Sequence, residues 1–180
     1  MPGRGVLPYS PTTLPNRLVH EVRPVCNTRP MDLRHTLPRS PRTAIAEVVM
    51  VARTADKARA DAAGTLGEYT YACRMSRMLF AFLETDADSF KASTISTPDD
   101  AGVTAFVNSR LQDLRRTAED IDAFNRAIHA PPTAEAIADF LEERHDVIPH
   151  RRDIWTYVDL IDAEEGRAVP IRVDTPAWAV

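Results

Sequence analysis

The sequence predicts a mostly α-helical protein that forms a single compact domain of about six helices with one short extended or hairpin segment. Apolar residues recur at helical spacing through most of the chain, and most of these stretches begin at a capping residue or end at a glycine. Only residues 64–73 combine glycine, tyrosine and threonine in the way that indicates a turn and an extended piece. The 180 residues suit one domain.

Three regions are expected along the chain. Residues 1–30 contain six prolines, which remove backbone donors, so we expect a disordered extension. Residues 31–167 form the helical domain, and residues 168–180, with Pro170 and Pro176, form an irregular tail.

The first helix is expected from Pro41 to Ala63. Ser40 is a suitable N-cap, proline is favoured at the first helical position, and Gly64 is a natural C-terminal stop. After the turn, a buried helix is marked by apolar side chains at helical spacing: Met75, Met78, Leu79 and Phe82.

Capping residues predict the remaining helices. Thr97, Thr117 and Thr133 each open one, and a last helix runs from about Asp153 to Glu165, where Gly166 ends it. No fixed-period repeat interrupts this series, so the helices are expected to pack into one bundle.

Charge and composition exclude several partners. The net charge is −4, with an excess of five positive charges in residues 1–43 and nine negative charges in the remainder. An acidic body argues against nucleic-acid binding, although the basic N-terminal stretch remains a weak exception. No apolar run reaches the roughly 18 residues that a membrane helix needs.

The two cysteines, Cys26 and Cys73, do not make a disulfide framework, and no apolar signal segment precedes Pro15, so a cytoplasmic location is expected. His145 and His150 do not match a zinc motif. We therefore expect neither a metal nor a cofactor. Cys73 carries no signature of a nucleophile and is interpreted as a small core residue.

Charged residues on apolar helix faces are the main functional signal. On the first helix, Asp56 and Arg59 fall within the apolar arc, three positions apart, so their side chains can meet. The last helix places Asp162 among its apolar residues, beside Trp155. If the two faces meet, these groups form one cluster. Such a cluster is either a structural ion-pair network or the lining of a functional pocket.

Further candidates lie nearby. Arg53 and Lys57 are four apart on the flank of the first helix, where they form either a solvated edge or the rim of a pocket that holds an anionic substrate. Glu68 and Tyr69 follow the turn at Gly67, and loops beside rigid helices commonly present catalytic groups. Gly64 and Gly67 lack the pattern of a phosphate loop.

Several fragments together resemble a bacterial family described only as a domain of unknown function, number 5069. The likeness extends over about residues 31–167 and rests on these stretches: residues 32–33, 38–42, 52–60, 64–69 and 155–167. The resemblance implies a bacterial, cytoplasmic, largely helical protein of one domain, and it brings no activity with it.

Two functions remain open. In the first, the protein is a small cofactor-independent enzyme that performs isomerase, lyase or cyclase chemistry on a small anionic or polar metabolite. Asp56, Arg59, Glu68 and Tyr69 would be catalytic, and the substrate would be held by other side chains: Arg53, Lys57, Trp155 and Asp162. In the second, it is a non-catalytic protein-interaction module with a structural charge cluster. A homo-oligomer is compatible with either.

Overall fold

A computed structural model describes residues 31–179, in which seven α-helices and two short 3-10 helices are connected by turns, without any strand. The proline-rich extension expected at residues 1–30 lies outside the described residues. No helix within residues 31–179 is both long and apolar enough to cross a bilayer. The helices have these bounds: α1 Val51–Ala62, α2 Arg74–Phe82, α3 Ala87–Ile95, α4 Ala101–Asp113, α5 Ala118–Ile128, α6 Ile137–Val147 and α7 Tyr157–Glu164.

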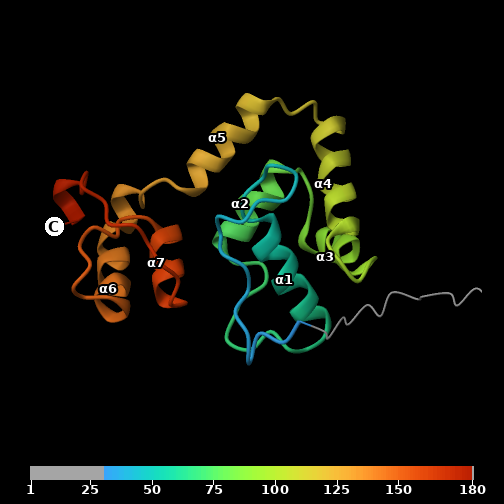
Figure 1. The fold of residues 1–180 in the computed structure, drawn as a ribbon. Helices are drawn as coiled ribbons and strands as arrows, with labels where there is room; N and C mark the ends of the chain where they lie inside the picture. The colour runs from blue at the N-terminus through green and yellow to red at the C-terminus, as the bar shows by residue number, and fades with distance from the viewer. Residues whose placement is uncertain (1–30, 180) are drawn as a thin grey trace, which may run out of the picture.

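Helix α1 lies at the centre of the larger group of helices (Figure 1). It packs against α3, which in turn packs against α4, while α5 crosses toward the pair formed by α6 and α7 (Figure 1). The N-terminal segment drawn in blue runs along α1 before the chain enters that helix, and hydrogen bonds described below join the two. The prediction of a mostly α-helical single domain is confirmed.

Two apolar cores support this arrangement. The main core surrounds α1 and includes Phe80, Phe90 and Val107. A smaller core is built from Phe140, Ile154 and Leu160, against which Trp178 of the 3-10 helix Ala177–Ala179 packs. Helix α7 contributes to both, because its Val158 belongs to the main core and its Leu160 to the smaller one.

The first helix is shorter than predicted. It begins at Val51, not at Pro41, because the backbone at Ala46, Glu47 and Met50 has positive φ values of 51°, 65° and 69°. A tight turn closes between Ile45 and Val48, whose N–H and carbonyl groups bond reciprocally at 3.2 and 3.1 Å. Ser40 and Pro41 therefore do not cap a helix.

A side chain from α5 holds this turn in place. The Asn125 carboxamide accepts a hydrogen bond from the Val49 N–H at 3.1 Å and donates one to the Glu47 carbonyl at 2.9 Å. Tertiary contact of this kind overrides local helical spacing, and the β-branched residues Val48 and Val49 have a low preference for helix.

The other predicted elements agree to different degrees. Thr117 opens α5 with a reciprocal capping box to Asp120, as its position indicated. Gly64 and Gly166 follow helix ends with φ values of 66° and 70°. Residues 64–73 form turns in place of the expected extended segment.

Besides α1, four helices were predicted imperfectly or missed. The helix predicted to open at Thr97 begins at Ala101, and the one expected from Thr133 begins as a short 3-10 helix before α6. The last helix starts at Tyr157, where the Thr156 side chain accepts a bond from the Asp159 N–H. Helix α3 was not predicted because few large apolar residues mark it, and it is capped by Asp86.

Gly102 in the first turn of α4 provides a test of the close packing between α3 and α4. A Cβ atom at this position would lie 2.5 Å from the Ser93 carbonyl and 2.3 Å from the Ser96 hydroxyl. We expect Gly102→Ala to lower the free energy of unfolding by about 1–3 kcal/mol, because the overpacking exceeds the gain in helix propensity. Chemical denaturation measures this change, and Asn108→Ala on the exposed side of the same helix should stay within about 0.5 kcal/mol. A stabilised Gly102→Ala variant would contradict the packing described.

Candidate functional site

The buried carboxylates predicted on two helices are bound by one segment of the chain, residues 38–42. Asp56 is 1% exposed and accepts bonds from the Arg39 backbone N–H at 2.8 Å and from its guanidinium at 2.9 and 2.7 Å. The Arg39 guanidinium also donates to the Asp100 carboxylate at 2.6 Å, and the Arg59 guanidinium lies 3.0 Å from the same carboxylate. Asp56 is thus fully engaged in ion pairs.

The same segment also binds α7, through Ser40 and Arg42. Asp162 accepts bonds from the Ser40 hydroxyl at 2.9 Å and the Arg42 Nε at 3.1 Å, and Arg42 also pairs with the buried Asp159. Asp56 and Asp162 share no ion-pair partner within residues 31–179, so the single cluster that would form if the two helix faces met is not present there. Arg39 binds Asp56 and Arg42 binds Asp162, so the 38–42 segment joins α1 to α7.

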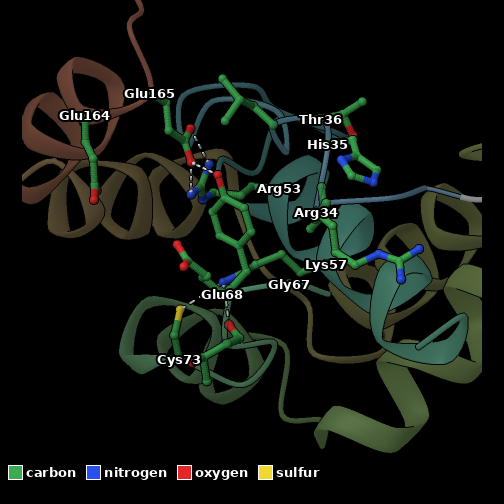
Figure 2. Close-up of a pocket in the computed structure, with 14 residues that line it drawn as sticks. Arg34, His35, Thr36, Arg53, Lys57, Gly67, Glu68, Cys73, Glu164 and Glu165 are labelled. Carbon is green, nitrogen blue, oxygen red and sulfur yellow. Dashed lines mark hydrogen bonds and ion pairs between the residues drawn. The ribbon is translucent and has the colours of Figure 1, made fainter. Parts of the chain in front are cut away.

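A cavity of about 900 Å³ lies beside α1 and the end of α7. Its wall comes from four parts of the chain: residues 33–37, one face of α1, the turns at residues 67–73, and the end of α7 (Figure 2). Of the eight residues that the sequence singled out, four line it: Arg53, Lys57, Glu68 and Tyr69. The other four do not: Asp56, Arg59, Trp155 and Asp162.

The turn at Gly67 shapes this wall. Gly67 has a φ of 64°, and a Cβ atom there would lie 3.2 Å from the Leu33 carbonyl, so a side chain is disfavoured on both grounds. The glycine lets residues 33–37 approach the turn closely, and Glu68 and Tyr69 follow immediately. The interpretation of Gly67 as a turn residue, and not as part of a phosphate loop, agrees with this geometry.

Lys57 is the most unusual group in the cavity wall. Its side chain is 3% exposed, and its Nζ donates to the Thr70 carbonyl at 2.9 Å and to the Cys73 Sγ at 3.1 Å. Burial lowers the pKa of this amine, and the neighbouring Arg53 lowers it further, although the sulfur acts in the opposite direction. The alternative that Arg53 and Lys57 form a solvated edge is wrong, since Arg53 is only 5% exposed.

Cys73 is the partner of Lys57. The interpretation of Cys73 as a small core residue was wrong. It is partly exposed and lines the cavity (Figure 2). It occupies the N-cap position of α2, with the Ser76 hydroxyl 3.5 Å from its sulfur. Burial raises the pKa of the thiol, but the charge of Lys57 and the bonds from Ser76 outweigh it and lower the pKa to about 7. No local motif marks this cysteine, so only the fold reveals the pair.

Arg53 and Tyr69 are oriented by Glu165, which the sequence did not identify as a site residue. Arg53 donates to the two oxygens of Glu165 at 2.6 and 2.9 Å, and the Tyr69 hydroxyl donates to the same carboxylate at 3.0 Å. Burial and the bond to Glu165 raise the pKa of Tyr69 to about 12, so the phenol remains protonated. Arg167 is a further partner of Glu165.

Glu68 differs from these groups because it is exposed and makes no side-chain hydrogen bond or ion pair within residues 31–179. Its carboxylate is available to a ligand. Among the described residues, no group of three or more His, Cys, Asp and Glu side chains is arranged to hold a metal ion. The arrangement offers proton donors and acceptors around a polar cavity, together with one activated thiol.

Fold and site define a small helical protein with a polar cavity walled by a buried lysine–cysteine pair. The chain belongs to the family described as domain of unknown function (DUF5069), whose model matches residues 35–167. No curated protein matches the chain.

The contacts of Asp56 generate a test of its structural role. Asp56→Ala leaves Arg39 without its main partner in a partly buried site, so we expect the free energy of unfolding to fall by about 3 kcal/mol. Thermal and chemical denaturation measure this loss. The matched control is Asp61→Ala on the same helix, whose pair with Lys91 is more exposed and should contribute less than about 1 kcal/mol. Equal, small losses for both variants would refute the structural role.

Proposed function

We propose that this protein is a small cofactor-independent enzyme that moves protons on a small anionic or polar metabolite, in an isomerase, lyase or cyclase reaction. The observation that carries this proposal is the buried Lys57 amine, 3.1 Å from the Cys73 sulfur, in the wall of a polar cavity. A buried amine is costly unless it is paired, and here the partner is a titratable thiol open to the cavity.

The pair is suited to general acid–base catalysis. Burial lowers the pKa of Lys57 and the charge of Lys57 lowers the pKa of Cys73 to about 7, so each group's protonation depends on that of the other. A base whose pKa lies near the working pH combines a useful fraction of the correct protonation state with adequate driving force. In the proposed reaction the Cys73 thiolate accepts a proton from the substrate, and the Lys57 ammonium stabilises the thiolate before transfer and the negative charge that develops on the substrate.

The remaining cavity residues divide into two roles. Glu68, with no partner among the described side chains, is the second proton-transfer group, and it accounts for the position predicted from the turn. Tyr69 is a positioning residue, because its single O–H stays protonated and donates to Glu165. Arg53 has its guanidinium occupied by Glu165 and the Arg39 carbonyl, so it is a positioning residue.

Asp56, Arg59 and Asp162 support the site from outside the cavity. Asp56 precedes Lys57 on α1, and its ion pair with Arg39 fixes the rotation of the helix about its axis. Trp155, which Arg172 covers at 4.7 Å from the ring centroid, is likewise outside the cavity. We assign these four residues to positioning and stability.

A bacterial, cytoplasmic setting belongs to the same proposal, because a thiol of lowered pKa stays reduced and reactive in a reducing compartment. The protein-interaction module remains the second candidate, and one observation favours it: the charges predicted on the helix faces form structural ion pairs. It gives no role to the lysine–cysteine pair. The experiments below therefore separate the two.

The reactivity of Cys73 tests the activated pair. In a Cys26→Ser background, the rate of alkylation by iodoacetamide should rise with pH through a midpoint of about 7, because the thiolate is the reacting form. Lys57→Met removes the positive charge while burial persists, so the midpoint should move above the ordinary thiol range and the thiolate fraction at pH 7 should fall at least about tenfold. Rates are measured by mass spectrometry of the intact protein.

The chain provides a matched control, since Lys91 is its only other lysine and lies in a more exposed pair with Asp61. Lys91→Met should leave the midpoint at about 7. A midpoint that is the same in the Lys57→Met and Lys91→Met variants would refute the coupling of Lys57 to Cys73.

Solvent exchange tests the reaction class. A metabolite library is first screened for compounds that raise the melting temperature, and each such compound is then incubated with the protein in D₂O. Proton abstraction incorporates deuterium at carbon, and Cys73→Ser or Lys57→Met should slow this exchange by about 10²–10⁴-fold. Ligands that bind without exchange or conversion would contradict the enzyme proposal and favour the binding module. Undiminished exchange in both variants would overturn the assigned roles.

A further inference from the structure

A second cavity, of about 340 Å³, lies behind Cys73. It is bounded by α2, the end of α5, α6 and α7, and its wall is mainly apolar: Met75, Met78, Ile128, Pro131, Pro132 and Ile161. This composition differs from the first cavity, whose wall carries arginine, lysine and three glutamates. The thioether side chains of the methionines adapt their shape to apolar groups of different outline.

Cys73 lies in the walls of both cavities. Cys73 therefore lies between a polar cavity and an apolar one. Its sulfur accepts a hydrogen bond from Lys57, which lines the polar cavity. A ligand atom that reaches the sulfur has polar groups on one side and apolar side chains on the other.

A second pair of residues supports the adjacency of the two cavities. Glu143 lines the apolar cavity and Glu164 lines the polar one. Desolvation and the charge of Glu164 raise the pKa of Glu143.

We infer that the substrate is a small molecule with a polar or anionic end and an apolar group, the apolar group occupying the second cavity and the reacting atom lying beside the Cys73 sulfur. This inference rests on the proposed function, because it takes Cys73 as the reactive group, and it adds the chemical class of the substrate. The polar end would contact Lys57, Glu68 and Tyr69. An exclusively polar metabolite would leave the apolar wall exposed to water, and burial of apolar surface would contribute nothing to binding.

Alkylation of Cys73 by matched reagents tests the apolar compartment without knowledge of the substrate. The protein with Cys26→Ser is treated with iodoacetamide or with N-hexyl iodoacetamide, and each rate is divided by that of the same reagent with free cysteine. We expect the normalised rate of the hexyl reagent to be about tenfold higher, because the alkyl chain leaves water as the sulfur reacts.

A blocking variant and its control locate the effect. Ala127 is an exposed residue on the wall of the second cavity, so Ala127→Trp can fill the space without disturbing a core. It should abolish the preference for the hexyl reagent and leave the rate with iodoacetamide unchanged. Ala118→Trp, at an exposed position on the same helix away from that wall, should retain the preference.

The outcomes distinguish the two proposals. Fast alkylation by both reagents at equal normalised rates would overturn the apolar compartment and leave the activated pair intact, as would a preference that survives Ala127→Trp. A pH midpoint of Cys73 alkylation in the ordinary thiol range would overturn the activated thiol and, with it, the inference that depends on it.

Discussion

The ion pairs between residues 38–42 and the two helices α1 and α7 are the constraint on which the rest of the structure depends. Arg39 binds Asp56 on α1, and Arg42 binds Asp162 on α7, with both carboxylates buried. A buried ion pair contributes little net stability compared with an apolar contact, but any other docking leaves an uncompensated charge in the interior. These pairs therefore fix how the helices are rotated and spaced, and they do so through an irregular segment.

The position of the cavity follows from this constraint. Asp56 and Lys57 are consecutive on α1, and successive residues of a helix are rotated by about 100°. When Asp56 faces Arg39, Lys57 faces the turns at residues 67–73, where Thr70 and Cys73 receive its bonds. The rotation of α1 about its axis therefore positions both the Asp56–Arg39 ion pair and the Lys57–Cys73 pair. At the end of α7, Glu165 comes near Arg53 for the same reason, since Asp162 and the 38–42 segment fix that helix.

The sequence was sufficient for the helical class and for the inward charges. Asp56 and Asp162 fell on apolar arcs, and both are buried. Helix ends marked by strong local signals, such as the cap at Thr117 and the stop at Gly64, were also predictable, because the stabilising contact lies within a few residues.

The partners of those charges were not predictable, because they depend on contacts distant in the chain. The Arg42–Asp162 pair joins residues 120 positions apart, and helical spacing carries no information on such a pairing. The start of α1 was misplaced for a similar reason, since Asn125 of α5 holds the turn before it. Cys73 had no neighbouring signature, as its activation comes from Lys57, sixteen positions earlier. Local sequence signals were thus sufficient to predict most helices, whereas the residues of the site are brought together by long-range contacts that such signals do not encode.

The position of α7 in both apolar cores has a consequence for cooperativity. Val158 and Leu160 lie two residues apart on a helix of eight residues, yet they belong to different cores. One core cannot lose this helix without exposing apolar surface of the other, so the two cores are energetically coupled despite their unequal sizes. We therefore expect the two cores to unfold in a single cooperative transition.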